Sequence, residues 1–386
     1  MRDFAAELDA RKSAGLYRSR RLISGPQQPA LTADDQSVLA FCSNDYLGLA
    51  SHPSVSGALL AAVPEVGVGG GSSHLICGHH DAHHRLELAL AGLTRRSSAL
   101  FFSTGYMANL GVISALAGRG DTIFSDRLNH ASIIDGCLLS RARVRRYPHN
   151  DMSALADMLA GTSGHKLVVT DGVFSMDGDL APLREMARLC REHDALLVVD
   201  DAHGIGVLGE HGGGTLEQLG LSEQEVPVLI GTLGKAIGTS GAFAAGPALL
   251  MDYLVQKART YIYTTAMPPA VAMATCAALE VIRDEPERRN HLRHLVERFR
   301  TEASALGYRL MPSHTPIQPI MVGDNWAALT LSRELEARGL LVTAIRPPTV
   351  PEGEARLRVT FSAAHTDADL DRLIAGLADC RCHYPG

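Results

Sequence analysis

The sequence lacks an apolar run long enough to cross a membrane. Its most apolar window, residues 266–282, opens with Pro268 and Pro269 and falls short of the roughly 18–20 apolar residues of a transmembrane helix. Prolines at a first turn followed by small apolar residues predict a buried helix here instead. Acidic residues within the first ten positions and the missing apolar segment predict no signal peptide. We therefore expect no membrane partner.

The sequence also lacks a basic surplus and a cysteine framework. Its 36 Lys and Arg residues face 42 Asp and Glu residues, a formal net charge of -6, so we expect no nucleic acid partner. The seven cysteines are scattered and odd in number. This pattern argues against structural disulfides and favours the reducing cytoplasm.

What the sequence does have is a regular alternation of short aliphatic runs with helical patterns. With 386 residues, 46% of them hydrophobic, the chain has enough apolar surface for a large core. The alternation predicts an α/β fold whose mainly parallel sheet is covered by helices on both faces. The expected strands are residues 98–103, 121–125, 166–170, 195–200 and 228–231.

The charge density rises after residue 284, which predicts a smaller C-terminal α+β domain. We predict an N-terminal arm at residues 1–45, a large cofactor-binding domain at residues 46–284 and the small domain at residues 285–386. Expected local elements include an amphipathic helix at residues 4–16 and strands at 38–42, 318–322, 340–344 and 356–360.

Lys235 stands alone in a stretch of Gly, Thr, Ser, Ala and aliphatic residues, residues 229–242. A poorly hydrated ammonium without a nearby counter-ion favours its neutral form, which makes this lysine a candidate nucleophile or base. The alternative is a glycine-rich turn with an exposed lysine at its tip.

A second signal precedes Lys235 by about thirty residues. The aliphatic run at residues 195–199 ends in Asp200, followed by His203, and the carboxyl end of a parallel strand is where α/β folds bind ligands. A strand-end Asp and an isolated downstream Lys match the requirements of pyridoxal phosphate (PLP). PLP needs an imine-forming lysine and a carboxylate that keeps its ring nitrogen protonated.

Other strand ends carry polar groups that suit the same cofactor. Gly105 and Tyr106 precede a predicted helix near Met107, whose backbone N–H groups can hold a phosphate. His130 supplies an imidazole that can stack on a ring, and Ser175 supplies a hydroxyl.

Two motifs favour other functions. GIGVLG at residues 204–209 matches a dinucleotide fingerprint, but DDAH separates it from the strand and no helical pattern follows. Histidines at positions 79, 80, 83 and 84 have the i,i+4 spacing of a zinc site, but a histidine-rich helix cap is the favoured interpretation. We therefore expect no metal, and a nucleotide- or zinc-binding protein without catalytic activity remains the alternative class.

Seven motifs together resemble the α-oxoamine synthases, PLP enzymes of the aspartate-aminotransferase fold (fold type I). The resemblance extends from about residue 8 to residue 377. One departure is GGGSSH at residues 69–74, where many members of the family have an arginine in place of His74. The motifs are SNDYLGL (43–49), NHAS (129–132), VFSMDGD (173–179), DDAHG (200–204), TLGK (232–235), IYTTAMPP (262–269) and AIRPPTVP (344–351).

The resemblance implies a role for each matching residue. Lys235 would carry PLP and remove the substrate α-proton, and Asp200 would pair with the ring nitrogen. His203 would hydrogen-bond the ring hydroxyl, and His130 would stack on the ring beside the substrate. The further implied contacts are Gly105, Tyr106 and Thr232 with the phosphate, Ser175 with the cofactor, Thr264 and Thr265 with the phosphate across a homodimer interface, Arg358 with the amino acid carboxylate, and Arg21 and Thr349 with the acyl-CoA substrate.

The activity implied by the resemblance is C-acyl transfer to an amino acid with loss of CO2. AIRPPTVP, with Ile317-Gln318-Pro319 before it, resembles the branch that joins L-alanine to pimeloyl-CoA, or to a pimeloyl-carrier protein, in biotin biosynthesis. The branch that joins glycine to acetyl-CoA shares the PLP residues and remains the alternative.

Overall fold

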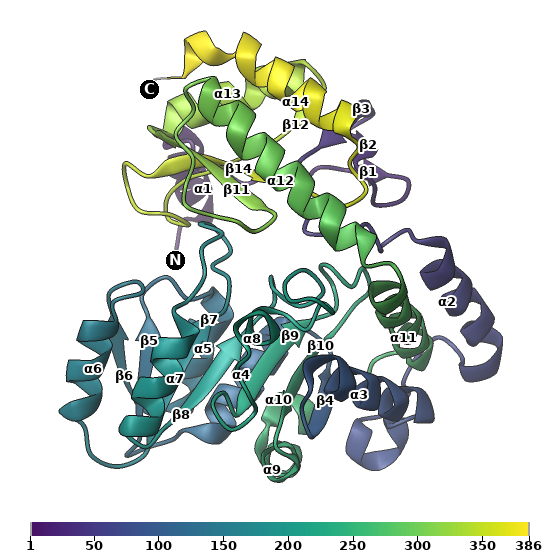
Figure 1. Ribbon diagram of the computed structural model, residues 1–386, viewed down its shortest axis with the longest axis vertical. Coiled ribbons are helices and arrows are strands. Elements are labelled where there is room, and N and C mark those ends of the chain that lie inside the picture. Colours follow the sequence, from purple (N-terminus) through teal and green to yellow (C-terminus); the bar gives the residue numbers. More distant parts are fainter. Residues whose placement is uncertain (1, 385–386) are drawn as a thin grey trace. The chain divides into compact units, whose positions relative to one another are not determined.

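The computed structural model describes residues 2–384 (Figure 1). It divides into two compact units: one comprises the described parts of Met1–Tyr46, Met176–Asp179 and Asn290–Gly386, and the other comprises Leu47–Ser175 and Leu180–Arg289. The first unit therefore contains both the predicted arm and most of the predicted C-terminal domain. Whether these parts fold as separate domains stays a prediction.

The larger unit is built on a seven-stranded sheet of order β4-β10-β9-β8-β7-β5-β6. Strands β5 to β9 pair with one another in parallel, whereas β10 is antiparallel to both β4 and β9. The mainly parallel sheet is thus as predicted. The strands are β4 (Ser98–Phe102), β5 (Thr122–Asp126), β6 (Arg143–Tyr147), β7 (Lys166–Asp171), β8 (Ala195–Asp200), β9 (Val228–Thr232) and β10 (Ala242–Gly246).

Helices cover both faces of this sheet, because successive strand residues point to opposite sides and both sides are apolar. On one face, Leu100 and Phe102 of β4 join a buried cluster with residues of α4, α5, α9 and α10. On the other, Phe101 is fully buried and its ring contacts His83 of α3. The helices of this unit are α2 (Pro53–Val66), η1 (His74–Gly78, a π-helical turn), α3 (Asp81–Thr94), α4 (Gly105–Leu116), α5 (Ala131–Ser140), α6 (Met152–Ala160), α7 (Leu183–Glu192), α8 (Thr215–Leu219), α9 (Ala248–Lys257), α10 (Arg259–Ile262) and α11 (Pro269–Asp284).

The smaller unit is α+β, as predicted, with an antiparallel sheet of order β11-β14-β13 and a second sheet of order β1-β2-β3-β12. Its strands are β1 (Ile23–Ser24), β2 (Ala30–Ala33), β3 (Gln36–Ala40), β11 (Ile317–Gly323), β12 (Leu340–Leu341), β13 (Thr343–Ile345) and β14 (Ala355–Thr360). Its helices are α1 (Phe4–Ser13), α12 (Glu287–Ala305, whose first residues belong to the larger unit), α13 (Asn325–Ala337), α14 (Asp367–Asp379) and the short 3-10 turn η2 (Arg381–His383).

Several expected elements differ in extent. The strand expected at residues 340–344 is two strands in different sheets: β12 pairs with β3, and β13 pairs with β14. The N-terminal helix ends at Ser13, before Gly15 with its positive φ of 66°. Within residues 2–384, no helix combines the length and apolar character needed to span a bilayer.

Candidate active site

The carboxyl ends of β8 and β9 place Asp200, His203 and Lys235 together. Nζ of Lys235 lies 2.9 Å from Nε2 of His203, a hydrogen-bonding distance across 32 positions of sequence. Lys235 follows β9, and His203 lies in the turn after β8, where it is 5% exposed. The lysine therefore lies beside the turn that follows the acid-terminated strand, and the catalytic roles of these residues stay a prediction.

Asp200 is the last residue of β8, and it is 6% exposed. Its Oδ1 accepts from the backbone N of Ala202 over 3.0 Å, and its Oδ2 accepts from Nδ2 of Asn109 over 2.6 Å. Two donors thus hold a buried carboxylate in one orientation. A carboxylate held in this way is suited to pair with a protonated ring nitrogen.

The neighbouring strand β7 ends in a second carboxylate. Asp171 pairs with Asp200 across the β7–β8 ladder, and its Oδ2 accepts from the backbone N of His130 over 2.7 Å. Burial raises the pKa of Asp171 well above its ordinary value, and the charge of Asp200 raises this pKa further. Asp171 therefore helps to fix the backbone position of His130.

His130 is exposed at the N-terminus of α5, and Ser132 contacts its ring. Oγ of Ser132 lies 2.7 Å from Nδ1 of His130, and the backbone N of Ser132 donates to the same nitrogen over 3.3 Å. Burial lowers the pKa of His130, the charge of Asp200 raises it and Lys235 lowers it. A neutral imidazole with an accessible ring face suits stacking on an aromatic cofactor.

The start of α4 and the end of β9 carry the residues that are predicted to hold the cofactor phosphate. Thr104 caps α4, accepting from the backbone N of Met107 over 3.1 Å, so the first N–H groups at Gly105 and Tyr106 have no acceptor within the helix. A Cβ added to Gly105 would lie 3.9 Å from Oγ1 of Thr232. Gly105 and Thr232 are thus neighbours. The hydroxyl of Tyr106 donates to Asp135.

These groups fit PLP: an amine, a held carboxylate, an accessible imidazole face and a helix N-terminus for the phosphate. Ser175, half-buried in the turn after β7, belongs to the same unit. Thr264 and Thr265 follow α10, where Thr265 pairs with Ser73 in an isolated antiparallel bridge. Their predicted contact with the phosphate of a partner subunit stays a prediction.

The smaller unit holds the predicted substrate residues. Arg358 of β14 is 7% exposed, and both its Nη1 and its Nη2 donate to Oδ1 of Asn44 over 3.2 Å. Arg21 and Thr349 both line a cavity of about 650 Å³, whose walls also carry Arg18 and Arg346. Arg21 donates to both carboxylate oxygens of Glu336, at 2.8 Å from Nη2 to Oε2.

Sequence reasoning missed Asn109 and the role of Asn44. Asn109 is 1% exposed within an otherwise apolar helix, and an isolated amide in such a helix was the available signal. The GxGxxG motif at residues 204–209 forms turns, and no helix follows until α8 at Thr215. The dinucleotide interpretation is therefore excluded.

The chain matches a known protein family and is similar to curated proteins. A model of the family "Aminotransferase class I and II" matches residues 36–377. The 8-amino-7-oxononanoate synthase of Marinobacter nauticus is 74% identical over 381 residues, which span 99% of this chain and 97% of that protein. The enzyme of the same name from Thioalkalivibrio sulfidiphilus is 60% identical over 379 residues, or 98% and 97% of the two chains.

The chain is also similar in fold to solved structures. A serine palmitoyltransferase variant from S. paucimobilis, with a bound PLP–myriocin aldimine, has a TM-score of 0.93 at 30% identity and matches 99% of each chain. The 8-amino-7-oxononanoate synthase of Francisella tularensis has a TM-score of 0.78 at 31% identity, covering 89% of this chain and 97% of that one.

Proposed function

This chain belongs to the aminotransferase class I and II family, and we propose that it catalyses the 8-amino-7-oxononanoate synthase reaction of biotin biosynthesis. L-alanine condenses with the pimeloyl thioester of CoA or of a carrier protein, giving 8-amino-7-oxononanoate, the free thiol and CO2. Relatives of that name at 74% and 60% identity, matched over nearly their whole length, support the choice of substrates.

The observation that carries the chemistry is the placement of the Lys235 amine 2.9 Å from His203, on the strand end next to Asp200. PLP, when bound, supplies a conjugated ring that accepts the electrons left on the amino acid Cα after proton loss. Lys235 would hold the cofactor through its amine, and its Nζ would take the proton from the amino acid Cα.

The surrounding residues orient the cofactor and the amino acid. The Asp200 carboxylate keeps a proton on the ring nitrogen, and His203 holds Lys235 and the ring hydroxyl within hydrogen-bonding reach. His130 covers one face of the ring, which excludes water from that side. Gly105, Tyr106 and Thr232 hold the phosphate, and Ser175 contacts the cofactor.

Arg358 binds the carboxylate of the amino acid with its two terminal nitrogens, which Asn44 already holds side by side. We assign the thioester substrate to the cavity lined by Arg21 and Thr349, because its further basic residues Arg18 and Arg346 suit the phosphates of CoA.

We further propose a cytoplasmic homodimer. The seven cysteines of the chain are all free thiols, as expected in a reducing compartment. Thr264 and Thr265 would complete the phosphate site of the partner subunit, so the dimer would be the active form.

The experiment that tests the substrate assignment measures thiol release by the PLP-loaded protein. L-alanine with pimeloyl-CoA is compared with glycine and acetyl-CoA. Faster release with the first pair, with 8-amino-7-oxononanoate as product, is the expected result. Preference for the second pair would keep the cofactor chemistry and reject the biotin-pathway assignment.

A further inference from the structure

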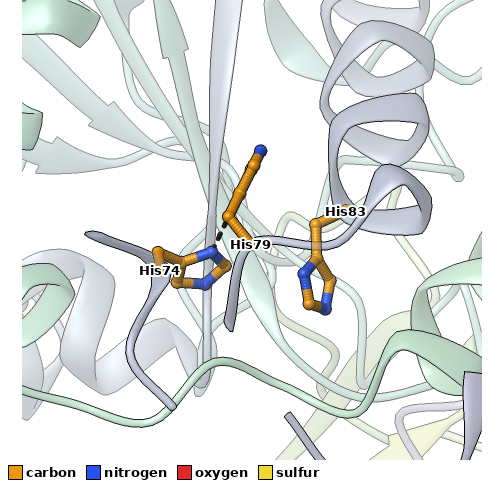
Figure 2. A group of neighbouring side chains, drawn as sticks. All are labelled: His74, His79 and His83. Carbon is orange, nitrogen blue, oxygen red and sulfur yellow. Dashed lines mark hydrogen bonds between the residues drawn. The ribbon is translucent and has the colours of Figure 1, made fainter. Parts of the chain in front are cut away.

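Three histidines that the proposed reaction does not use lie together at the start of α3. Figure 2 shows His74 and His79 joined by a hydrogen bond, with His83 alongside, extending from the first turn of that helix. The bond joins the two Nδ1 atoms over 2.9 Å, and one ligand atom from each of the three rings lies within 4.8 Å of the others. His74 lies outside the motif at residues 79–84, and the π-helical turn η1 brings it there.

The surroundings of the three imidazoles favour their neutral form. Burial, followed by the neighbouring His83 and His79, lowers the pKa of His74 to about 4. Burial is also the largest cause of the lowered pKa values of His79 and His83. A neutral imidazole has a free lone pair, which is the form that coordinates metals.

The rings are held in place before any ion binds. His74 stacks on Tyr261 with centroids 4.8 Å apart and an interplanar angle of 10°. His83 is fully buried, with Nε2 2.7 Å from the carbonyl of Met267 and Nδ1 accepting from the backbone N of His80 over 3.0 Å. The His79 side chain is 33% exposed, which gives an ion a path from solvent.

Glu87 lies beside His79, at the ring nitrogen opposite the one that faces His74. Its Oε2 lies 3.8 Å from Nε2 of His79, the nitrogen opposite the one that faces His74, and its Oε1 accepts from the backbone N of Phe101 over 2.9 Å. A carboxylate behind a ligating imidazole fixes the tautomer in which the other nitrogen is free for the metal.

We propose that His74, His79 and His83 bind one divalent transition metal ion of the zinc class, with Glu87 orienting His79. Three imidazoles are a ligand set that suits zinc and leaves a fourth position for water. Zinc–nitrogen bonds are about 2.0–2.1 Å long, so the 2.9 Å separation between Nδ1 of His74 and Nδ1 of His79 must widen slightly. His83 must also exchange one of its two backbone hydrogen bonds for a bond to the ion.

The site would stabilise the glycine-rich loop that precedes it. The backbone N of Ala266 donates to the carbonyl of Ser72 over 2.9 Å, and a Cβ at Gly70 would come within 2.3 Å of the carbonyl oxygen of Ala266. The loop therefore lies tightly against the segment that carries Thr265. An ion on His74 would tie this loop to α3, whatever reaction the enzyme catalyses.

The test measures zinc binding to the PLP-loaded, chelator-stripped protein by equilibrium dialysis against a chromophoric competitor. We expect one zinc ion per chain, and a Co²⁺ spectrum with ligand-field bands and no thiolate charge-transfer band. Glu87→Gln, which changes a residue that does not itself bind the ion, should weaken zinc binding roughly 10–100-fold. His79→Gln removes a ligand at an exposed side chain and should weaken zinc binding by a larger factor.

Two further variants separate this site from its neighbours. His74→Gln should weaken zinc binding like His79→Gln, whereas His314→Gln, at an exposed histidine of the other unit, should bind zinc like the wild type. His79, His84 and Glu87 form an overlapping group, so His84→Gln is the decisive comparison. Loss of zinc in His84→Gln but not in His74→Gln, or no stoichiometric zinc in the wild type, would overturn the proposal.

Discussion

Nδ2 of Asn109 donates to Oδ2 of Asp200 over 2.6 Å, with both side chains buried. The same amide lies 2.9 Å from Oγ of Ser132, which lies 2.7 Å from Nδ1 of His130. One hydrogen-bonded chain thus connects the carboxylate proposed to hold the PLP ring nitrogen with the imidazole proposed to stack on the ring. The two groups are positioned together.

Asn109→Ala should weaken PLP binding without unfolding the protein. It leaves the buried Asp200 oxygen without its donor, a loss of about 1.5–3 kcal/mol for a hydrogen bond to a charged group, or roughly 10–100-fold in the cofactor dissociation constant. Titration of the cofactor-free protein with PLP, followed by visible absorbance, measures this. Ser114→Ala on the same helix removes only a bond to its own helix backbone and serves as the control. Equal PLP affinity in the two variants would refute the positioning role.

Lys235→Ala should abolish the visible absorption band of covalently held PLP and lower kcat by at least about 10²–10⁴-fold, the contribution of a positioned base. Thiol release and the absorption spectrum are the measurements. Lys257→Ala, at an exposed lysine of α9, should change neither. A normal band in Lys235→Ala would show that another group carries the cofactor.

In the seven-stranded sheet, the strands that the sequence predicts contain runs of large apolar residues. Continuous aliphatic runs such as those of β7 and β8 are typical of parallel strands that are covered on both faces. β6, with three arginines, lies at the sheet edge. β10 is fully buried but is made of Ala, Phe and Gly, so neither strand has the run of large aliphatic residues that predicts a buried strand. Their positions depend on pairing partners elsewhere in the chain.

The candidate site likewise contains some residues that the sequence predicts and others that it does not. Lys235, His203 and Asp200 were predictable as neighbours because parallel strands end at one edge of the sheet. Asn109 was not, because its partner Asp200 is 91 positions away and an isolated amide does not show which residue it binds. His74 was seen only as a missing arginine, since its neighbours depend on the turn η1.

Arg358→Lys should raise KM for L-alanine by roughly 10–100-fold, because an ammonium cannot replace a two-pronged hydrogen bond to a carboxylate. KM for pimeloyl-CoA should change little. Asn44→Ala should raise the same KM by a smaller factor, since it frees the guanidinium that Asn44 holds. Steady-state kinetics with each substrate varied in turn measure this. Equal rises in both KM values would contradict a role specific to the amino acid.

Co-expression of two inactive variants should restore activity if Thr264 and Thr265 act across a dimer interface. One chain carries Lys235→Ala, and the other carries Thr264→Ala with Thr265→Ala. A mixed dimer then has one intact site, so random pairing should restore about a quarter of wild-type activity. Differently tagged chains allow purification of the mixed dimer. Absence of restoration in that species would place both threonines in the site of their own subunit.

Asp201 should make the protein less stable as the pH rises. Its buried Oδ2 accepts from the backbone N of Thr215 over 2.6 Å, and no partner for Oδ1 is found among residues 2–384. Burial raises the pKa of Asp201 to about 8, whereas the ordinary value is 3.8. The native state keeps a proton that the unfolded chain loses, so this stabilisation is complete below the ordinary pKa and is lost as pH rises through about 8.

The Asp201→Asn variant cannot ionise and should lack this dependence. Between about pH 6 and pH 8, the wild-type free energy of unfolding should therefore fall by about 1–3 kcal/mol more than that of the variant. Urea unfolding of the cofactor-free proteins at both pH values measures the difference. Asp252→Asn, at an exposed aspartate of α9, should retain the wild-type slope. Parallel pH profiles for wild type and Asp201→Asn would mean that Asp201 is ionised in the native state, and Thr215 would then be binding a charged carboxylate.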